Sequence, residues 1–230
     1  MNPVLLLAAI LPAAILLVRV YRLDRIEKEP PALLLKLVLL GALSGLAASL
    51  LELGLVRLLR LWLREEGVLY LLLENFFAVA LVEELCKRAP VRHYAWRHPA
   101  FDYRFDAVVY CVFAALGFAV LENILYVVRY GLSVAASRAL LSVPGHCFFA
   151  VYMGIYLGEA KRADREGELY ERDRFLAASI AVPALLHGFW DFSLSVGSAW
   201  MTAAFYVFVL VFFLSANHRL RTASEEDSLL

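Results

Sequence analysis

Two adjacent glutamates stand in the stretch VEELCK, where Glu83 and Glu84 are followed by Lys87. Residues three and four apart share one face of a helix, so both carboxylates can reach the lysine ammonium. Such a group could serve as a general base held beside a fixed positive charge. It could equally be a salt-bridged helix end at a membrane surface, where an ion pair contributes little.

Other ionisable groups interrupt apolar sequence, and burying each of them in hydrocarbon costs several kcal/mol, which makes them candidates for function. They are Glu52, Glu74, Glu122, His146, His187 and Asp191. His187 and Asp191 lie four apart, so the carboxylate could fix the tautomer of the imidazole. Taken alone, Glu122 and the neighbouring Asn123 are better explained by hydrogen bonds to another helix than by catalysis.

Carboxylates and two histidines, with no serine or cysteine placed for attack, indicate chemistry by an activated water. In one version a glutamate is the general base. In the other, His146, His187 and Glu84 bind a divalent metal such as zinc and leave one position open for water. The sequence leaves both versions open, and both favour a hydrolase.

Long apolar helices must position these groups, because 62% of the 230 residues are hydrophobic and only 19% are charged. A membrane-spanning helix needs about 20 apolar residues. The segments that approach this length are 3–18, 33–56, 68–86 or 75–96, 105–128, 134–158, 175–193 and 199–217. The sequence therefore predicts an all-α, polytopic membrane helix bundle with about seven transmembrane helices, forming a single domain over residues 1–230.

The third segment has two possible windows, and depth distinguishes them. At about 1.5 Å per residue, Glu122, His187 and Asp191 lie in the outer half of their helices. A helix that ended at Cys86 would leave Glu84 near the cytoplasmic face, far from these groups. We therefore expect the later window, 75–96, with Lys87 as a buried counter-ion.

The positive charges separate by side of the membrane. One side holds only five of them, namely Arg57, Arg60, Arg64, Arg129 and Arg138. The positive-inside rule then places the N-terminus outside and the C-terminus in the cytoplasm. Acidic and basic residues cancel at 22 each, so the net charge gives no indication of a nucleic-acid partner, and we expect none.

Four ordered motifs resemble those of the PrsW intramembrane proteases, a family related to the CAAX-processing prenyl endopeptidases and the bacteriocin-immunity-type membrane proteins. The motifs are VEELCK, an F-x-x-x-E pattern that ends at Glu122, PGHCFFAVYMGIYLG with His146, and LLHGFWD with His187 and Asp191. They cover residues 70–195, most of the chain. The resemblance implies site-1 type cleavage of a membrane-anchored, anti-sigma-factor-like substrate in the bacterial plasma membrane, with catalytic roles for the paired glutamates and the histidines.

Together these observations predict a helix bundle with a polar cavity that opens toward the outer side. One or both glutamates activate water, and His146 and His187 polarise the scissile carbonyl. Asp191 orients His187, and Glu122 with Asn123 completes the polar wall. The sequence does not decide which glutamate is the base, nor the substrate or oligomeric state.

Two other classes of function stay open on the sequence. A non-enzymatic membrane scaffold or immunity-type protein could keep the same motifs. A proton- or cation-coupled transporter would also bury carboxylates and histidines, but it usually shows inverted repeats and paired broken helices, which this sequence lacks.

Overall fold

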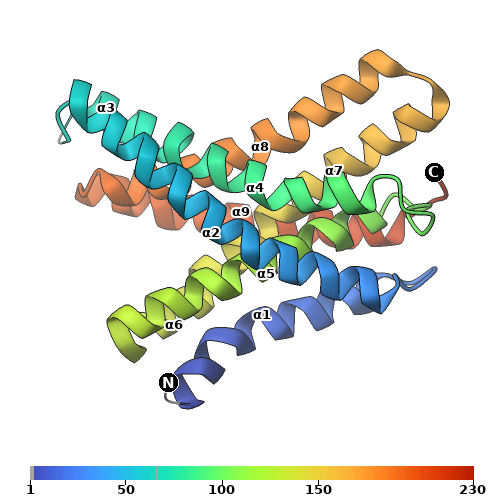
Figure 1. The fold of residues 1–230 in the computed structure, drawn as a ribbon, viewed down its shortest axis with the longest axis horizontal. Coiled ribbons are helices and arrows are strands. Elements are labelled where there is room, and N and C mark those ends of the chain that lie inside the picture. Colours follow the sequence, from blue (N-terminus) through green and yellow to red (C-terminus); the bar gives the residue numbers. More distant parts are fainter. Residues whose placement is uncertain (1–2, 66) are drawn as a thin grey trace.

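A computed structural model describes residues 3–65 and 67–230, and these ranges are helical throughout except for the connecting turns and one isolated bridge between Tyr103 and Leu229. The long helices are α1 (Pro3–Leu23), α2 (Pro31–Trp62), α5 (Asp106–Tyr130), α7 (Val143–Glu166), α8 (Leu169–Ser195) and α9 (Ala199–Glu225) (Figure 1). In the described ranges, six helical segments are long and apolar enough to cross a membrane. The predicted polytopic helical bundle is confirmed.

The third predicted span is a further continuous helical stretch over residues 68–95. It consists of α3 (Val68–Leu73), the π-helical segment η1 (Glu74–Leu81), α4 (Val82–Pro90) and the π-helical segment η2 (Val91–Ala95). The stretch does not end at Cys86, so the helix covers both of the windows that the sequence offered. Its charged residues, Glu74, Glu83, Glu84, Lys87, Arg88 and Arg92, set it apart from the six apolar segments.

Close helix crossings set the shape of the bundle. A Cβ atom on Gly41 of α2 would lie 2.0 Å from the carbonyl oxygen of Ala114 in α5, and one on Gly117 would lie 2.1 Å from that of Val38. These two glycines therefore let the backbones of α2 and α5 touch. Beyond the crossing the two helices diverge, α2 toward α3 and α5 toward α6 (Ala135–Ser137), as Figure 1 shows.

Helix α5 forms the centre of the bundle and is buried along its first half. Helix α7 packs against it through Gly154 and Gly158, where a side chain would clash with Val108 and Arg104. The small-residue spacing in the sequence serves this contact.

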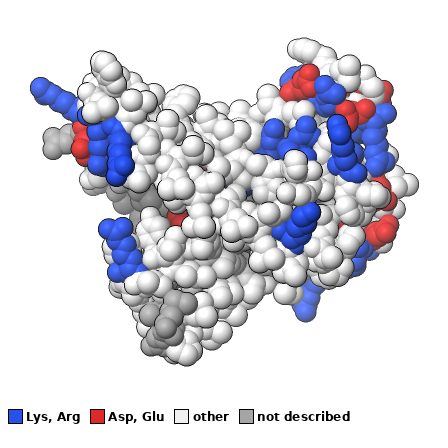
Figure 2. Space-filling model, in the orientation of Figure 1, with Lys and Arg blue, Asp and Glu red and all other residues white. Residues whose placement is uncertain are grey.

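The charged side chains gather at the two ends of the long axis, with more of them at the end that contains the C-terminus (Figure 2). Between the ends, large apolar side chains such as Leu46, Leu50 and Leu210 are exposed. An exposed apolar belt of this kind fits a lipid environment.

Candidate active site

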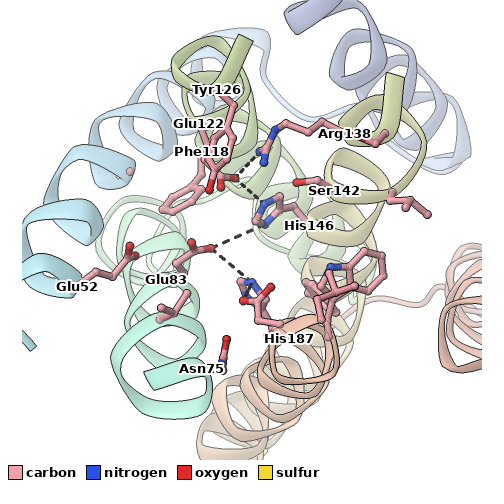
Figure 3. Close-up of a pocket in the computed structure, with 18 of the residues that line it drawn as sticks. Glu52, Asn75, Glu83, Phe118, Glu122, Tyr126, Arg138, Ser142, His146 and His187 are labelled. Carbon is pink, nitrogen blue, oxygen red and sulfur yellow. Dashed lines mark hydrogen bonds and ion pairs between the residues drawn. The ribbon is translucent and has the colours of Figure 1, made fainter. Parts of the chain in front are cut away.

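A cavity of about 630 Å³ lies where α2 and α5 diverge. Its walls come from α2, η1, α4, α5, α7, α8 and α9, and Figure 3 shows polar side chains reaching into it from several of them. The ionisable residues that line it are Glu52, Glu83, Glu122, Arg138, His146, His187 and Asp191. The divergence of two tightly crossed helices thus opens a polar space inside an apolar bundle.

Lys87 lies behind the cavity and is completely buried. Its Nζ donates to Glu83 Oε2 at 2.9 Å and to Glu84 Oε1 at 2.7 Å, and it lies 2.9 Å from Nδ1 of His146. The ring of Phe118 lies 4.7 Å from the ammonium. Lys87 therefore joins α4 to α7 and neutralises part of the charge on both glutamates.

The adjacent glutamates face different surroundings, because neighbouring residues on a helix point about 100° apart. Glu83 lines the cavity, where its Oε2 lies 4.0 Å from His146 Nδ1 and 3.8 Å from His187 Nε2. Glu84 is completely buried and does not line the cavity. The two carboxylates are consequently not equivalent in access to water.

His187 lies between two carboxylates. Its Nδ1 is 3.0 Å from Glu84 Oε1, and its Nε2 is 3.2 Å from Asp191 Oδ2, four residues along α8. Carboxylates accept hydrogen bonds, so both contacts are satisfied when both ring nitrogens carry a proton, which is the imidazolium form. The ring of Phe149 stacks on the imidazole at 4.9 Å.

His146 has the opposite pattern of partners. Its Nδ1 faces the Lys87 ammonium, which can only donate, and its Nε2 lies 2.9 Å from Glu122 Oε2. This arrangement is satisfied by a neutral imidazole that carries its proton on Nε2. The contacts of the two histidines of the cavity thus favour different protonation states.

Arg138 lines the cavity. The sequence indicates it only as a positive charge on the outer side. Its Nη2 lies 2.9 Å from Glu122 Oε2, and its Nε donates to Asn123 Oδ1 at 2.9 Å. Asn123 is buried and donates to the backbone carbonyl of Ala9, so it faces α1 rather than the cavity. The expected polar wall of Glu122 and Asn123 is therefore a wall of Glu122 and Arg138.

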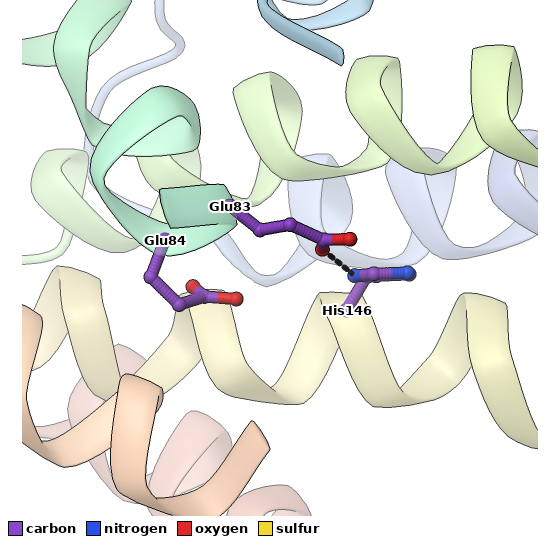
Figure 4. Close-up of side chains that lie close together, drawn as sticks. All are labelled: Glu83, Glu84 and His146. Atoms are coloured by element: carbon purple, nitrogen blue, oxygen red, sulfur yellow. Dashed lines mark ion pairs between the residues drawn. The ribbon is translucent and has the colours of Figure 1, made fainter. Parts of the chain in front are cut away.

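Three side chains could hold a metal ion: Glu83, Glu84 and His146 each offer one ligand atom, and these atoms lie within 4.8 Å of one another (Figure 4). Carboxylate oxygen and unprotonated imidazole nitrogen are common zinc ligands, and Glu84 Oε2 is buried without a hydrogen bond. The sequence expected His187 in this set, whereas the structure groups Glu83 with Glu84 and His146. Lys87 Nζ lies between these three donors, so an ion bound there would displace it.

Known proteins are similar to this chain over most of its length. Residues 29–216 match the family model described as PrsW family intramembrane metalloprotease. The chain is 35% identical to "Protease PrsW" of Geobacillus kaustophilus over 197 residues, covering 85% of this chain and 82% of that protein. It is 33% identical to "Protease PrsW" of Oceanobacillus iheyensis over 221 residues, covering 96% of each.

"Protease PrsW" of Bacillus subtilis is 37% identical over 153 residues, which cover 65% of this chain and 68% of that protein. No solved structure matches the chain with significance. A family match over most of the chain, together with relatives that align over nearly their whole length, shows what kind of enzyme this is. The chain belongs to the PrsW family of intramembrane metalloproteases.

Proposed function

We propose that this intramembrane protease hydrolyses its substrate with Glu83 as the general base. The observation that carries the proposal is the position of the Glu83 carboxylate in the cavity, 3.8 Å from His187 Nε2 and 4.0 Å from His146 Nδ1. A water molecule that Glu83 deprotonates would attack the scissile carbonyl carbon. The proton on Glu83 would then pass to the leaving amine nitrogen as the C–N bond breaks.

The other groups have positioning or electrostatic roles in this proposal. His187, held between Glu84 and Asp191, would stabilise the developing oxyanion by the positive charge of its imidazolium form. Lys87 places a buried ammonium 2.9 Å from the Glu83 carboxylate. His146 fixes the Lys87 ammonium on one side and is itself fixed by Glu122 on the other.

Glu83, Glu84 and His146 are the residues that would hold a metal ion. When bound, the metal would supply a Lewis acid that polarises the substrate carbonyl and lowers the pKa of water. The Lys87 ammonium contacts the same three side chains, so it would compete with a metal ion for them.

For the substrate, we propose a membrane-anchored protein with a single span, of the anti-sigma-factor type, cut in the bacterial plasma membrane. The cavity supports a substrate segment bound among membrane-spanning helices, because residues of α2 and α5 line it. The bacterial relatives support the location.

The proposal is tested by purifying the protein in detergent, reconstituting it into liposomes with a tagged single-span substrate, and following fragment release. Glu83→Gln should lower the rate by roughly 10²–10⁴-fold, the range for loss of a general base. Glu74→Gln is the matched control, because Glu74 accepts a hydrogen bond from Tyr70 and does not line the cavity. Its rate should stay within about twofold of wild type, as for most substitutions remote from a reacting centre.

Metal content is measured on the same preparation. Stoichiometric zinc in the wild type, with loss of activity on chelation and recovery on re-addition, would assign the metal version of the site. An active, metal-free preparation would show that Glu83 and the histidines act without a metal ion. Wild-type rates in Glu83→Gln would contradict the proposal in either version.

A further inference from the structure

Glu52 is a carboxylate of the cavity wall that the proposed mechanism does not use. It projects from α2 toward Glu83, as Figure 3 shows. Its Oε1 is buried and has no hydrogen-bond partner, and no ion pair involves this side chain in the described part of the chain. Burying a carboxylate oxygen without a hydrogen-bond partner costs free energy. At a cavity, a bound ligand that donates to this oxygen would remove that cost.

Each of the other carboxylates at the cavity has a cationic or imidazole partner at 3.2 Å or less. The pairs are Glu83 with Lys87, Glu84 with Lys87 and His187, Glu122 with Arg138 and His146, and Asp191 with His187. Glu52 stands apart from this pattern although it lines the same space.

Carboxyl groups outnumber lysine and arginine side chains at the site. Five carboxyl groups line or back the cavity, namely Glu52, Glu83, Glu84, Glu122 and Asp191. The lysine and arginine side chains paired with them are Lys87 and Arg138. A substrate that brings a positive charge would therefore improve the balance, and the unpaired Glu52 is where that charge would be met.

We infer that Glu52 selects substrates that carry a lysine or arginine close to the scissile bond. The aliphatic stem of such a side chain would lie along apolar residues that line the same cavity, such as Val79, Leu121 and Leu125. A sphere with the cavity's volume of 630 Å³ would be about 11 Å across, which is the length of about three extended residues. The basic residue thus lies within about three positions of the bond that Glu83 cuts.

Exposed arginines at the rim do not reverse this preference. Arg57 and Arg60 lie near the Trp62 end of α2, and Figure 2 shows an acidic side chain in the recess between two basic groups at that end. Exposed charges are screened over about 8–10 Å at physiological salt. The carboxylates of the desolvated cavity dominate the interaction with a bound side chain.

This inference rests on the proposed function, and its test uses pairs of single-span substrates whose cleavage site has been mapped by mass spectrometry. Each of the three positions on either side of the scissile bond is changed in turn to arginine or to glutamine. The measured quantity is the ratio of kcat/KM for the two members of a pair, so a general loss of activity cancels. Wild type should prefer arginine by about tenfold or more at one position at least.

Glu52→Gln, which keeps the size of the side chain, should bring that ratio close to one, and Glu52→Lys should invert it in favour of a glutamate at the same position. Glu74→Gln should keep the wild-type ratio. If a Glu52 variant is too slow to assay, the dissociation constants of the same pairs are compared in the Glu83→Gln background with and without Glu52→Gln.

Two results would overturn the inference: no preference in wild type, or a preference that survives in Glu52→Gln. Either result leaves the assignment of Glu83 standing if Glu83→Gln is inactive on both members of the pair. Cleavage by Glu83→Gln would instead remove the proposed function.

Discussion

Two groups of buried carboxylates in this protein are stabilised in different ways. The first surrounds the cavity, where Lys87, Arg138 and His187 supply positive charge. The second joins the loop after α1 to the start of α5 and consists of Asp24, Glu29 and Asp106. Within the described residues this second group makes no ion pair with a lysine or arginine.

Hydrogen bonds replace cations in the second group. Tyr110 donates to Glu29, which shares a further hydrogen bond with Asp106. Asp106 accepts from the backbone N–H groups of Asp102 and Tyr103, at 3.0 and 2.7 Å. Burial raises the pKa of Asp24 to about 6 and that of Glu29 to about 7.

Buried carboxyl groups therefore serve two purposes in this protein. A carboxylate that must take a proton from water has to be ionised, so the cavity group is held beside cations. A carboxyl group that only ties two segments together can keep its proton, so the second group needs hydrogen bonds alone. Removing a cation from the first group and removing a carboxyl group from the second should therefore have different effects on stability and activity.

The largest effect is expected for Lys87→Met, which removes the buried cation and leaves Glu83 and Glu84 without compensation. Breaking a buried ion pair from one side costs about 3–5 kcal/mol. The free energy of unfolding in detergent should fall by about this amount, and substrate cleavage should be lost. Thermal unfolding and fragment release measure the two quantities.

Lys36→Met is the control for this substitution, since Lys36 is exposed and contacts the ring of Tyr94. It should shift stability by less than about 0.5 kcal/mol. Unchanged stability in Lys87→Met would show that the glutamates are protonated, and the contrast with the second group would disappear.

A smaller effect is expected for Asp191→Asn. An amide at this position cannot stabilise the imidazolium of His187 as a carboxylate does, and loss of such an orienting partner typically costs about 10–100-fold in activity. The rate should fall by that amount with little change in KM, because the oxyanion forms only in the transition state. A rise in KM with unchanged kcat would instead assign Asp191 to substrate binding.

How far the sequence predicts this site depends on the range over which each residue acts. The spacing of His187 and Asp191 and of Glu83, Glu84 and Lys87 is local to one helix, and the helical period alone brings these side chains together. The continuation of the helix beyond Cys86 is predicted from depth, because side chains that meet must lie at the same level in the membrane.

Contacts between helices are harder to predict. The sequence marks Arg138 only as a positive charge on the outer side, whereas in the structure it lies in the π-helical segment η4 (Arg138–Ser142) before α7 and reaches Glu122. The rotation of Asn123 toward α1 and the separation of Glu83 from Glu84 both depend on helix orientation about its own axis. These helices are apolar on nearly all faces, so the sequence does not indicate which face of each helix points toward the cavity.

Arg138→Met should lower cleavage by about tenfold, the effect of about 1.4 kcal/mol. Glu122 keeps its contact with His146 but loses the permanent cation, so the charge balance of the cavity becomes more negative. Arg129→Met is the control, because the guanidinium of Arg129 lies against Tyr130 and is exposed. Equal losses of cleavage activity in Arg138→Met and Arg129→Met would mean that these arginines act only through the overall positive charge of the outer side.

The smallest effect is expected in the second group, from Glu29→Gln. The pKa of Glu29 is raised from 4.5 to about 7 in the folded protein, so the folded state binds more protons than the unfolded state between these values. Its contribution to stability is therefore complete below about pH 4.5 and is lost as the pH rises through about 7. Glutamine does not titrate, so the variant should gain stability relative to wild type between pH 5 and 8, by at most about 1 kcal/mol after screening.

Melting temperatures in detergent across this pH range measure the gain, with Glu27→Gln as the control, since Glu27 is exposed in the same loop. Removing a carboxyl group from the second group should thus favour folding at high pH, whereas removing a cation from the cavity group disfavours it. A gain that is independent of pH would show that Glu29 is ionised throughout. The two groups would then differ in location but not in the protonation state that their partners impose.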